Sequence, residues 1–264
     1  MTTPLNDDPV RAERLAGGEV LRLLLYRPKG NLLDGKMLAA LTSAIERHAA
    51  DPALKVILFE GAGPNFSFGA SVAEHVRAEA PAMLRQFHGL FHLLGRLAIP
   101  TAAVVRGACL GGGCELAAWC SFVFASPDAL FGQPEIKLAV LPPMASLLLP
   151  WRLGGARGLD LCVTGRTLSA TEAESFGLVT EIAAEPLTAC LAYLAQHLSP
   201  SSASSLRFAE RAARAGLNRH FTDELPGLER LYLDELMATP DANEGIAAFL
   251  ERRKPRWATG EAAS

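Results

Sequence analysis

Short apolar segments alternate with amphipathic segments along the first part of the chain. The apolar segments at 18–28, 55–61 and 100–107 have the length and composition of buried strands. Between them, segments 37–50 and 81–97 repeat apolar residues at helical spacing. Strands that alternate with helices pair in parallel in one sheet, so this order predicts an α/β fold.

The pattern changes toward the C-terminus. From Thr167 onward it predicts helices almost throughout, with one short strand at 178–183. The expected amphipathic helices of this part cover 201–216, 223–238 and 241–253. We therefore expect two regions, an α/β core over 1–195 and a helical region over 196–264.

Composition narrows the class of protein. The chain has 264 residues, of which 50% are hydrophobic and 20% charged, as expected for a globular protein. A net charge of −3 gives no electrostatic reason to expect a nucleic acid or an anionic membrane as partner. The most apolar segment, 138–153, is interrupted by prolines and is too short to span a bilayer.

The N-terminus and the cysteines favour a cytoplasmic protein. MTTPLNDDPV lacks the basic and apolar regions of a signal peptide. Five cysteines are an odd number in apolar surroundings, which favours reduced thiols over disulfides. Their spacing has no CxxC pair and no histidine nearby, so we expect no metal site.

The stretch GACLGGGCELAAW, residues 107–119, combines three consecutive glycines with one glutamate. Glycines before a helix let a ligand approach the backbone, and the first turn of a helix presents unpaired N–H groups. Such donors suit a phosphate or a developing oxyanion, although tight packing of helix against sheet also explains the glycines. The run matches neither GxGxxG nor the phosphate-loop pattern.

Two glutamates are candidates for acid–base chemistry. Glu115 falls in the first turn of the expected helix among apolar neighbours, where burial would raise its pKa. Glu135, in FGQPEIKLAV, is expected on a loop after a short strand, because Pro134 imposes an extended or turn conformation. A loop glutamate is normally solvated. Two glutamates that each lie in a glycine- or proline-shaped turn within an apolar segment are, however, the pattern expected for paired acid–base groups.

A third element, FSFGAS at 66–71, follows the second strand. Gly69 allows tight backbone geometry there and would leave the Ala70 N–H free to donate a hydrogen bond. An ordinary turn between strand and helix has the same composition.

These motifs, in this order over about residues 18–257, resemble the enoyl-CoA hydratase/isomerase (crotonase) superfamily. The matching segments are FSFGAS, IPTAAVVRGACLGGGCELA, FGQPEIKLAVLP, VTGRTLSATEAESFGLV and FLERRKPRW. The resemblance implies an α/β spiral core of ββα turns with a C-terminal helical region used in oligomerisation. It also implies a homo-oligomer, a trimer or a dimer of trimers, with an acyl-CoA thioester substrate and no cofactor beyond the substrate's own coenzyme A.

The same resemblance assigns the site. The backbone N–H groups of Ala70 and Gly112 match the family's oxyanion hole, which binds the thioester oxygen. Glu115 and Glu135 match its two catalytic glutamates. One of them orients or deprotonates water, and the other, which we expect to be Glu135, exchanges a proton with carbon. Because both are present, the resemblance favours hydration over isomerisation.

Departures from the family pattern concern the acyl pocket. LPPMASLLLPWRLG replaces a glycine-rich stretch of many hydratases, which places Pro143 and Met144 in the pocket wall. Ser71 replaces an aspartate of many relatives, and Phe68 belongs to the same loop. These features resemble the branch that hydrates cyclohexa-1,5-diene-1-carbonyl-CoA to 6-hydroxycyclohex-1-ene-1-carbonyl-CoA in anaerobic benzoyl-CoA breakdown.

Basic residues are the candidates for binding coenzyme A. Arg27 and Lys29 follow the first expected strand, where relatives approach the nucleotide. A second basic cluster, in 252–256, could contact phosphates or could be a solvated helix end. Three other functions stay open from sequence: a general short-chain enoyl-CoA hydratase, a double-bond isomerase, and a non-catalytic acyl-CoA- or RNA-binding relative.

Overall fold

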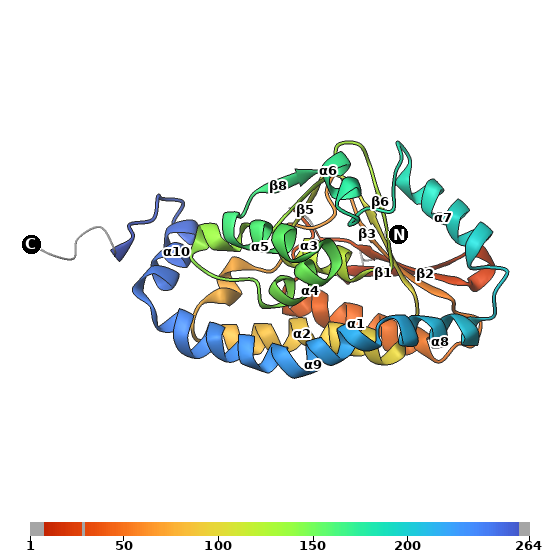
Figure 1. Ribbon diagram of the computed structural model, residues 1–264, viewed down its shortest axis with the longest axis horizontal. Helices are drawn as coiled ribbons and strands as arrows, with labels where there is room; N and C mark the ends of the chain where they lie inside the picture. The colour runs from red at the N-terminus through yellow and green to blue at the C-terminus, as the bar shows by residue number, and fades with distance from the viewer. Residues whose placement is uncertain (1–7, 28–29, 259–264) are drawn as a thin grey trace, which may run out of the picture.

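Two β-sheets organise the computed structural model, which describes residues 8–27 and 30–258 (Figure 1). The larger has the strand order β1-β2-β3-β4-β6-β9 and the smaller the order β5-β7-β8. The strands are β1 (Val10–Leu15), β2 (Val20–Leu25), β3 (Val56–Gly61), β4 (Thr101–Val105), β5 (Ala108–Leu110), β6 (Phe122–Ala125), β7 (Leu130–Gly132), β8 (Thr167–Ser169) and β9 (Glu181–Ile182). From β2 to β9 every pair in the larger sheet is parallel, which confirms the predicted α/β fold.

Helices follow the strands and then dominate the C-terminal part. They are α1 (Gly35–Ala49), α2 (Ala80–Leu97), α3 (Gly112–Trp119), α4 (Pro143–Leu153), α5 (Gly155–Thr164), α6 (Ala170–Ser175), α7 (Pro186–His197), α8 (Ala203–Ala213), α9 (Ala215–Arg230) and α10 (Pro240–Leu250). Short 3₁₀ segments are η1 (Ala16–Gly18), η2 (Val72–His75), η3 (Pro134–Leu138) and η5 (Leu236–Ala238), and η4 (Leu231–Glu235) is π-helical.

Several expectations about the elements were wrong in detail. Strand β1 was not predicted, and it pairs antiparallel with β2. Strand β8 is an additional strand in the part expected to be helical, because it completes the smaller sheet against β7. Glu135 lies in η3 rather than in an irregular loop, since Pro134 can begin a helical turn. The helix expected at 223–238 begins earlier, at Ala215, and becomes π-helical at Leu231.

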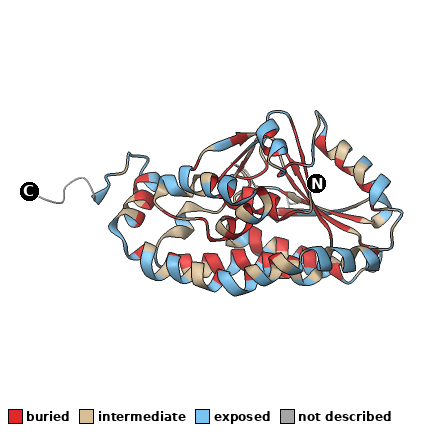
Figure 2. Ribbon diagram, in the orientation of Figure 1, coloured by how far each residue is buried: buried red, intermediate tan, exposed pale blue. Residues whose placement is uncertain are grey.

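Both faces of the larger sheet are covered, as a parallel sheet requires. On one face Val20, Leu58 and Phe124 pack against Cys190 and Leu194 of α7. The other face belongs to the main core, together with α1, α2, α3 and α4 (Figure 2). Part of the helical region after residue 196 joins this same core, through apolar side chains of α9: Leu217, Phe221 and Leu225.

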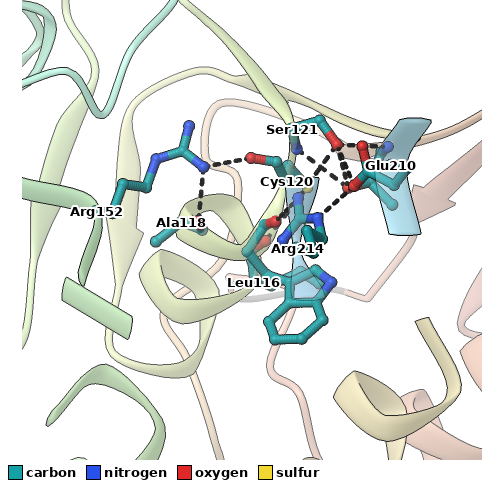
Figure 3. A network of polar contacts seen from close by, with 9 residues as sticks. Leu116, Ala118, Cys120, Ser121, Arg152, Glu210 and Arg214 are labelled. Carbon is teal, nitrogen blue, oxygen red and sulfur yellow. Dashed lines mark hydrogen bonds and ion pairs between the residues drawn. The ribbon is translucent and has the colours of Figure 1, made fainter. Parts of the chain in front are cut away.

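Helix α3 is buried along its whole length, and two arginines bind the carbonyl groups at its C-terminal end (Figure 3). Arg152 of α4 donates to the Ala118 oxygen at 2.8 Å, and Arg214, between α8 and α9, donates to the Trp119 oxygen at 2.6 Å. Burial lowers the pKa of Arg152 to about 10, so it stays charged at neutral pH. Cations here complement the negative end of the helix dipole and hold α3 in place.

Among the described residues, no helix combines the length and the apolar character needed to cross a membrane.

Candidate active site

The smaller sheet brings the two predicted glutamates together. Strands β5 and β7 are parallel, with Leu110 opposite Gly132, so their C-terminal ends meet at one edge. Glu115 follows β5 in the first turn of α3, and Glu135 follows β7 in η3. The Gly111 N–H also donates to the Gly132 oxygen at 2.9 Å, which joins the two connections.

Glu115 is a buried carboxyl, only 4% exposed. Its Oε1 accepts a hydrogen bond from the Ala145 N–H at 2.7 Å. Burial raises the pKa of Glu115 well above its usual range, and the neighbouring charge of Glu135 raises it further. The hydrogen bond from Ala145 opposes this rise without cancelling it. Glu115 therefore holds a proton far more readily than an exposed glutamate does.

Glu135 lies against the glycine run. A Cβ placed on Gly111 would be 2.6 Å from Glu135 Oε1, so a side chain at position 111 would collide with the carboxyl group. Burial raises the pKa of Glu135 to about 7. The Gln133 amide, oriented with its nitrogen toward this carboxyl, donates to both oxygens at 3.1 and 3.3 Å. A buried pair with raised pKa values exchanges protons near neutral pH.

Two backbone N–H groups lie beside the glutamates. A Cβ on Gly112 would be 3.3 Å from the Ala70 nitrogen, and a Cβ on Gly69 would be 2.9 Å from the Gly112 nitrogen. In the described part of the chain, neither the Ala70 nor the Gly112 N–H donates to a protein acceptor. Two free donors side by side, one of them at the positive end of α3, form the geometry that stabilises an oxyanion.

The loop that carries Ala70 is held by Asn31, a residue that the sequence motifs did not indicate. Asn31 is buried, and its backbone is in the left-handed region at φ 49°. Ser67 Oγ donates to the Asn31 oxygen at 2.8 Å. The Gly-Asn pair in KGNLLD is a turn signal, but nothing local shows that this side chain reaches the next loop. In the structure, Asn31 Nδ2 donates at 3.0 to 3.1 Å to three carbonyl oxygens of the loop after β3, those of Ala62, Asn65 and Phe66.

The predicted substrate-binding residues occupy two places. Arg27 and Phe68 line an open cavity of about 350 Å³, also bordered by Tyr26. There Phe68 is 44% exposed, and Arg27 forms an ion pair with Asp34 at 2.9 Å. Lys29 lies outside the described residues.

The second place is the start of α4, next to Glu115. Pro143 and Met144 are buried there, and Met144 belongs to the main core. The segment also contacts the carboxyl pair directly, because its next residue, Ala145, supplies the hydrogen bond to Glu115.

The remaining candidates, Ser71 and the basic cluster, lie outside these two places. Ser71 precedes η2, and its carbonyl oxygen lies 2.9 Å from His75 Nδ1. In the basic cluster at 252–256, Arg253 is paired with Glu244 and Glu251. Within residues 8–27 and 30–258, no three His, Cys, Asp or Glu side chains gather in a way that could hold a metal.

The fold and the site define a class of protein: an α/β protein with two free main-chain donors beside a buried pair of carboxyl groups, the arrangement expected of an enzyme that stabilises an oxyanion. Known proteins place the chain within that class. Residues 16–260 match the family model described as enoyl-CoA hydratase/isomerase. The chain belongs to the enoyl-CoA hydratase/isomerase family, which confirms the resemblance drawn from its motifs.

Individual relatives are named as hydratases. The chain is 46% identical to the cyclohexa-1,5-dienecarbonyl-CoA hydratase of Thauera aromatica, over 91% of this chain and 93% of the relative. It is 39% identical to a probable enoyl-CoA hydratase of Mycobacterium bovis, over 89% of this chain and 93% of the relative. A solved enoyl-CoA hydratase from Mycobacterium avium has 28% identity and a TM-score of 0.84, covering 96% of this chain and 100% of its own.

Replacement of Gly69 by alanine should disrupt the pair of N–H donors. A Cβ there would be 2.8 Å from the Leu110 oxygen and 2.9 Å from the Gly112 nitrogen, so the two backbone segments must separate. We expect kcat/KM for an acyl-CoA substrate to fall by about 10²- to 10³-fold, the effect of losing an oxyanion donor.

Gly177→Ala is the matched control for this change. Gly177 also has a positive φ, +83° against +92° for Gly69, but a Cβ there meets no atom within 4 Å. Both variants carry similar backbone strain, so only Gly69→Ala should lose activity. Equal activities, measured after both variants are shown to be folded, would contradict the assignment of the donors.

Proposed function

We propose that the protein is a hydratase, a lyase that adds water to an α,β-unsaturated acyl-CoA thioester. The observation that carries this proposal is the pair of buried carboxyl groups, Glu115 and Glu135, next to the free N–H groups of Ala70 and Gly112. Membership of the enoyl-CoA hydratase/isomerase family supports the same chemistry.

In the proposed reaction the thioester oxygen accepts hydrogen bonds from Ala70 and Gly112. Negative charge moves onto this oxygen as the bond to water forms, so the donors stabilise the transition state more than the ground state. The dipole of α3 acts in the same direction, because Gly112 is its first residue.

The two carboxyl groups transfer the protons of the proposed reaction. With raised pKa values and mutual repulsion, the pair holds one proton near neutral pH. The charged member accepts a proton from water as its oxygen attacks carbon, and the protonated member delivers a proton to carbon. In the form that reacts, the shared proton lies on Glu135 and the charge on Glu115, whose carboxylate accepts from the Ala145 N–H and lies in the first turn of α3. Glu135 then delivers its proton to carbon while Glu115 takes one from water, so the pair again holds one proton.

We propose a cyclic dienoyl thioester as substrate, cyclohexa-1,5-diene-1-carbonyl-CoA, hydrated to 6-hydroxycyclohex-1-ene-1-carbonyl-CoA in benzoyl-CoA breakdown. The hydroxyl group would go to the β carbon and the proton to the γ carbon. Support comes from the 46% identity to the Thauera aromatica enzyme, against 39% to a probable enoyl-CoA hydratase. The buried Pro143 and Met144 at the start of α4 also support a stiff pocket wall.

The cavity at Arg27 and Phe68 is the proposed place for part of the coenzyme A. An exposed aromatic ring can stack on a nucleotide base, and the guanidinium group can bind phosphate. The cavity adjoins the loop that carries Ala70, because Phe68 of that loop lines it. In the proposed reaction the thioester end of the same substrate lies at Ala70.

We also propose that copies of the chain assemble into a trimer or a dimer of trimers. Large apolar side chains are exposed on the neighbouring elements α5, η3 and α10, which favours burial against another copy. They are Ile136, Leu159, Val163 and Phe249. The five free cysteines, all among the described residues, support a reducing cytoplasmic location.

Exchange of each glutamate for glutamine tests the proton chemistry. Glu115→Gln and Glu135→Gln keep the shape of the side chain but remove its acid–base function. We expect each to lower kcat for hydration by about 10²- to 10⁴-fold, while the dissociation constant for a saturated acyl-CoA changes little. Activity like that of the wild type in either variant would remove that residue from the mechanism.

The choice of substrate separates the remaining alternatives. We expect the purified protein to convert the cyclic dienoyl-CoA with a higher kcat/KM than linear crotonyl-CoA, and mass spectrometry should show a product heavier by one water. A product of unchanged mass would indicate an isomerase. Faster hydration of crotonyl-CoA would indicate a general enoyl-CoA hydratase, and tight binding of acyl-CoA without turnover would indicate a non-catalytic relative.

A further inference from the structure

Tyr232 is a buried tyrosine whose hydroxyl group lacks a protein partner. The residue is only 1% exposed, and its Oη makes no hydrogen bond within residues 8–27 and 30–258. Buried tyrosine hydroxyls normally find a partner, because the loss of hydration is otherwise uncompensated. A phenylalanine would fill the same space without that loss, so the hydroxyl group has donor capacity that a bound ligand can use.

The surroundings of Tyr232 place its ring beside the segment that follows Glu135. Its ring packs in one apolar cluster with Leu84 of α2 and with Val140, which follows shortly after Glu135 in the chain. The Val140 N–H donates to the Glu135 carbonyl oxygen at 3.3 Å, so the ring lies against the segment that holds the catalytic carboxyl. Burial raises the pKa of Tyr232, and the charge of Glu135 raises it further. The phenol therefore stays neutral and can donate.

The local backbone fixes this tyrosine in place. It belongs to η4, where the helix widens from α to π geometry, a change often found at functional sites. About one turn earlier, Glu229 of α9 binds His88 Nδ1 of α2 at 2.6 Å. Leu84 of α2 shares the apolar cluster of Tyr232, so both contacts tie this part of the helix to α2. Figure 1 shows α9 running along α2.

We propose that Tyr232 Oη donates a hydrogen bond to the oxygen of the water molecule that is added to the substrate. This rests on the proposed hydratase function. The two O–H groups of the water can face the two carboxyl groups, while one lone pair accepts from Tyr232 and the other attacks carbon. In the reverse reaction the same donor stabilises the departing oxygen. Tyr232 keeps its own proton throughout.

Tyr232→Phe tests the proposal, because it removes the hydroxyl oxygen alone. We expect kcat for hydration to fall by about 10- to 100-fold with little change in KM, since the lost contact acts on water. The melting temperature should stay equal or rise, because an unpartnered buried group is removed. Tyr193→Phe in α7, whose ring packs against Phe122 and Phe124 of the sheet, is the matched control and should keep full activity.

A binding measurement separates positioning of oxygen from a structural role. The hydroxylated acyl-CoA product carries the oxygen that Tyr232 is proposed to contact, so Tyr232→Phe should weaken its binding by about tenfold. The saturated acyl-CoA without the hydroxyl group should bind equally well to both proteins. Equal binding of the hydroxylated product, or a kcat like that of the wild type, overturns the proposal. Absence of hydration by the wild-type protein would instead refute the proposed function.

Discussion

The close approach of two backbone segments, one at Gly69 and Ala70 and the other at the first turn of α3, governs the geometry of the site. No side chain fits between them, since a Cβ on Gly69 would be 2.9 Å from the Gly112 nitrogen. Each segment is anchored separately, because Asn31 holds the loop and Arg152 binds the far end of α3. The donors are therefore in position before a substrate arrives, which is the condition for stabilising a transition state.

The same arrangement explains how two carboxyl groups can be buried together. The first turn of α3 and the Ala145 N–H favour a charged Glu115, while burial and Glu135 oppose it. The balance leaves the pair with raised pKa values, so that one proton can move within it near neutral pH. Neither carboxyl would behave this way alone in water, where the pKa of a glutamate is about 4.3.

Local sequence signals predicted the framework of this site, but the contacts that complete it depend on tertiary packing. Apolar runs marked β2, β3 and β4, and the glycines before an apolar helix marked α3 with Glu115 in its first turn. The meeting of Glu115 with Glu135 follows from the parallel pairing of β5 with β7, which no local pattern contains. In the same way, the Ala145 N–H reaches Glu115 from 30 residues away, and Tyr232 reaches the segment after Glu135 from beyond the end of α9. Periodicity and spacing give no signal for such contacts.

The proposed mechanism depends above all on one proton being shared between Glu115 and Glu135 near neutral pH. An NMR titration of isotope-labelled glutamate side chains, with each variant to glutamine for assignment, measures this property directly. We expect one carboxyl of the pair to titrate with a pKa of about 7, and the other to remain protonated to higher pH. Titration of both groups at about 4.3, the pKa of an exposed glutamate, would contradict the mechanism.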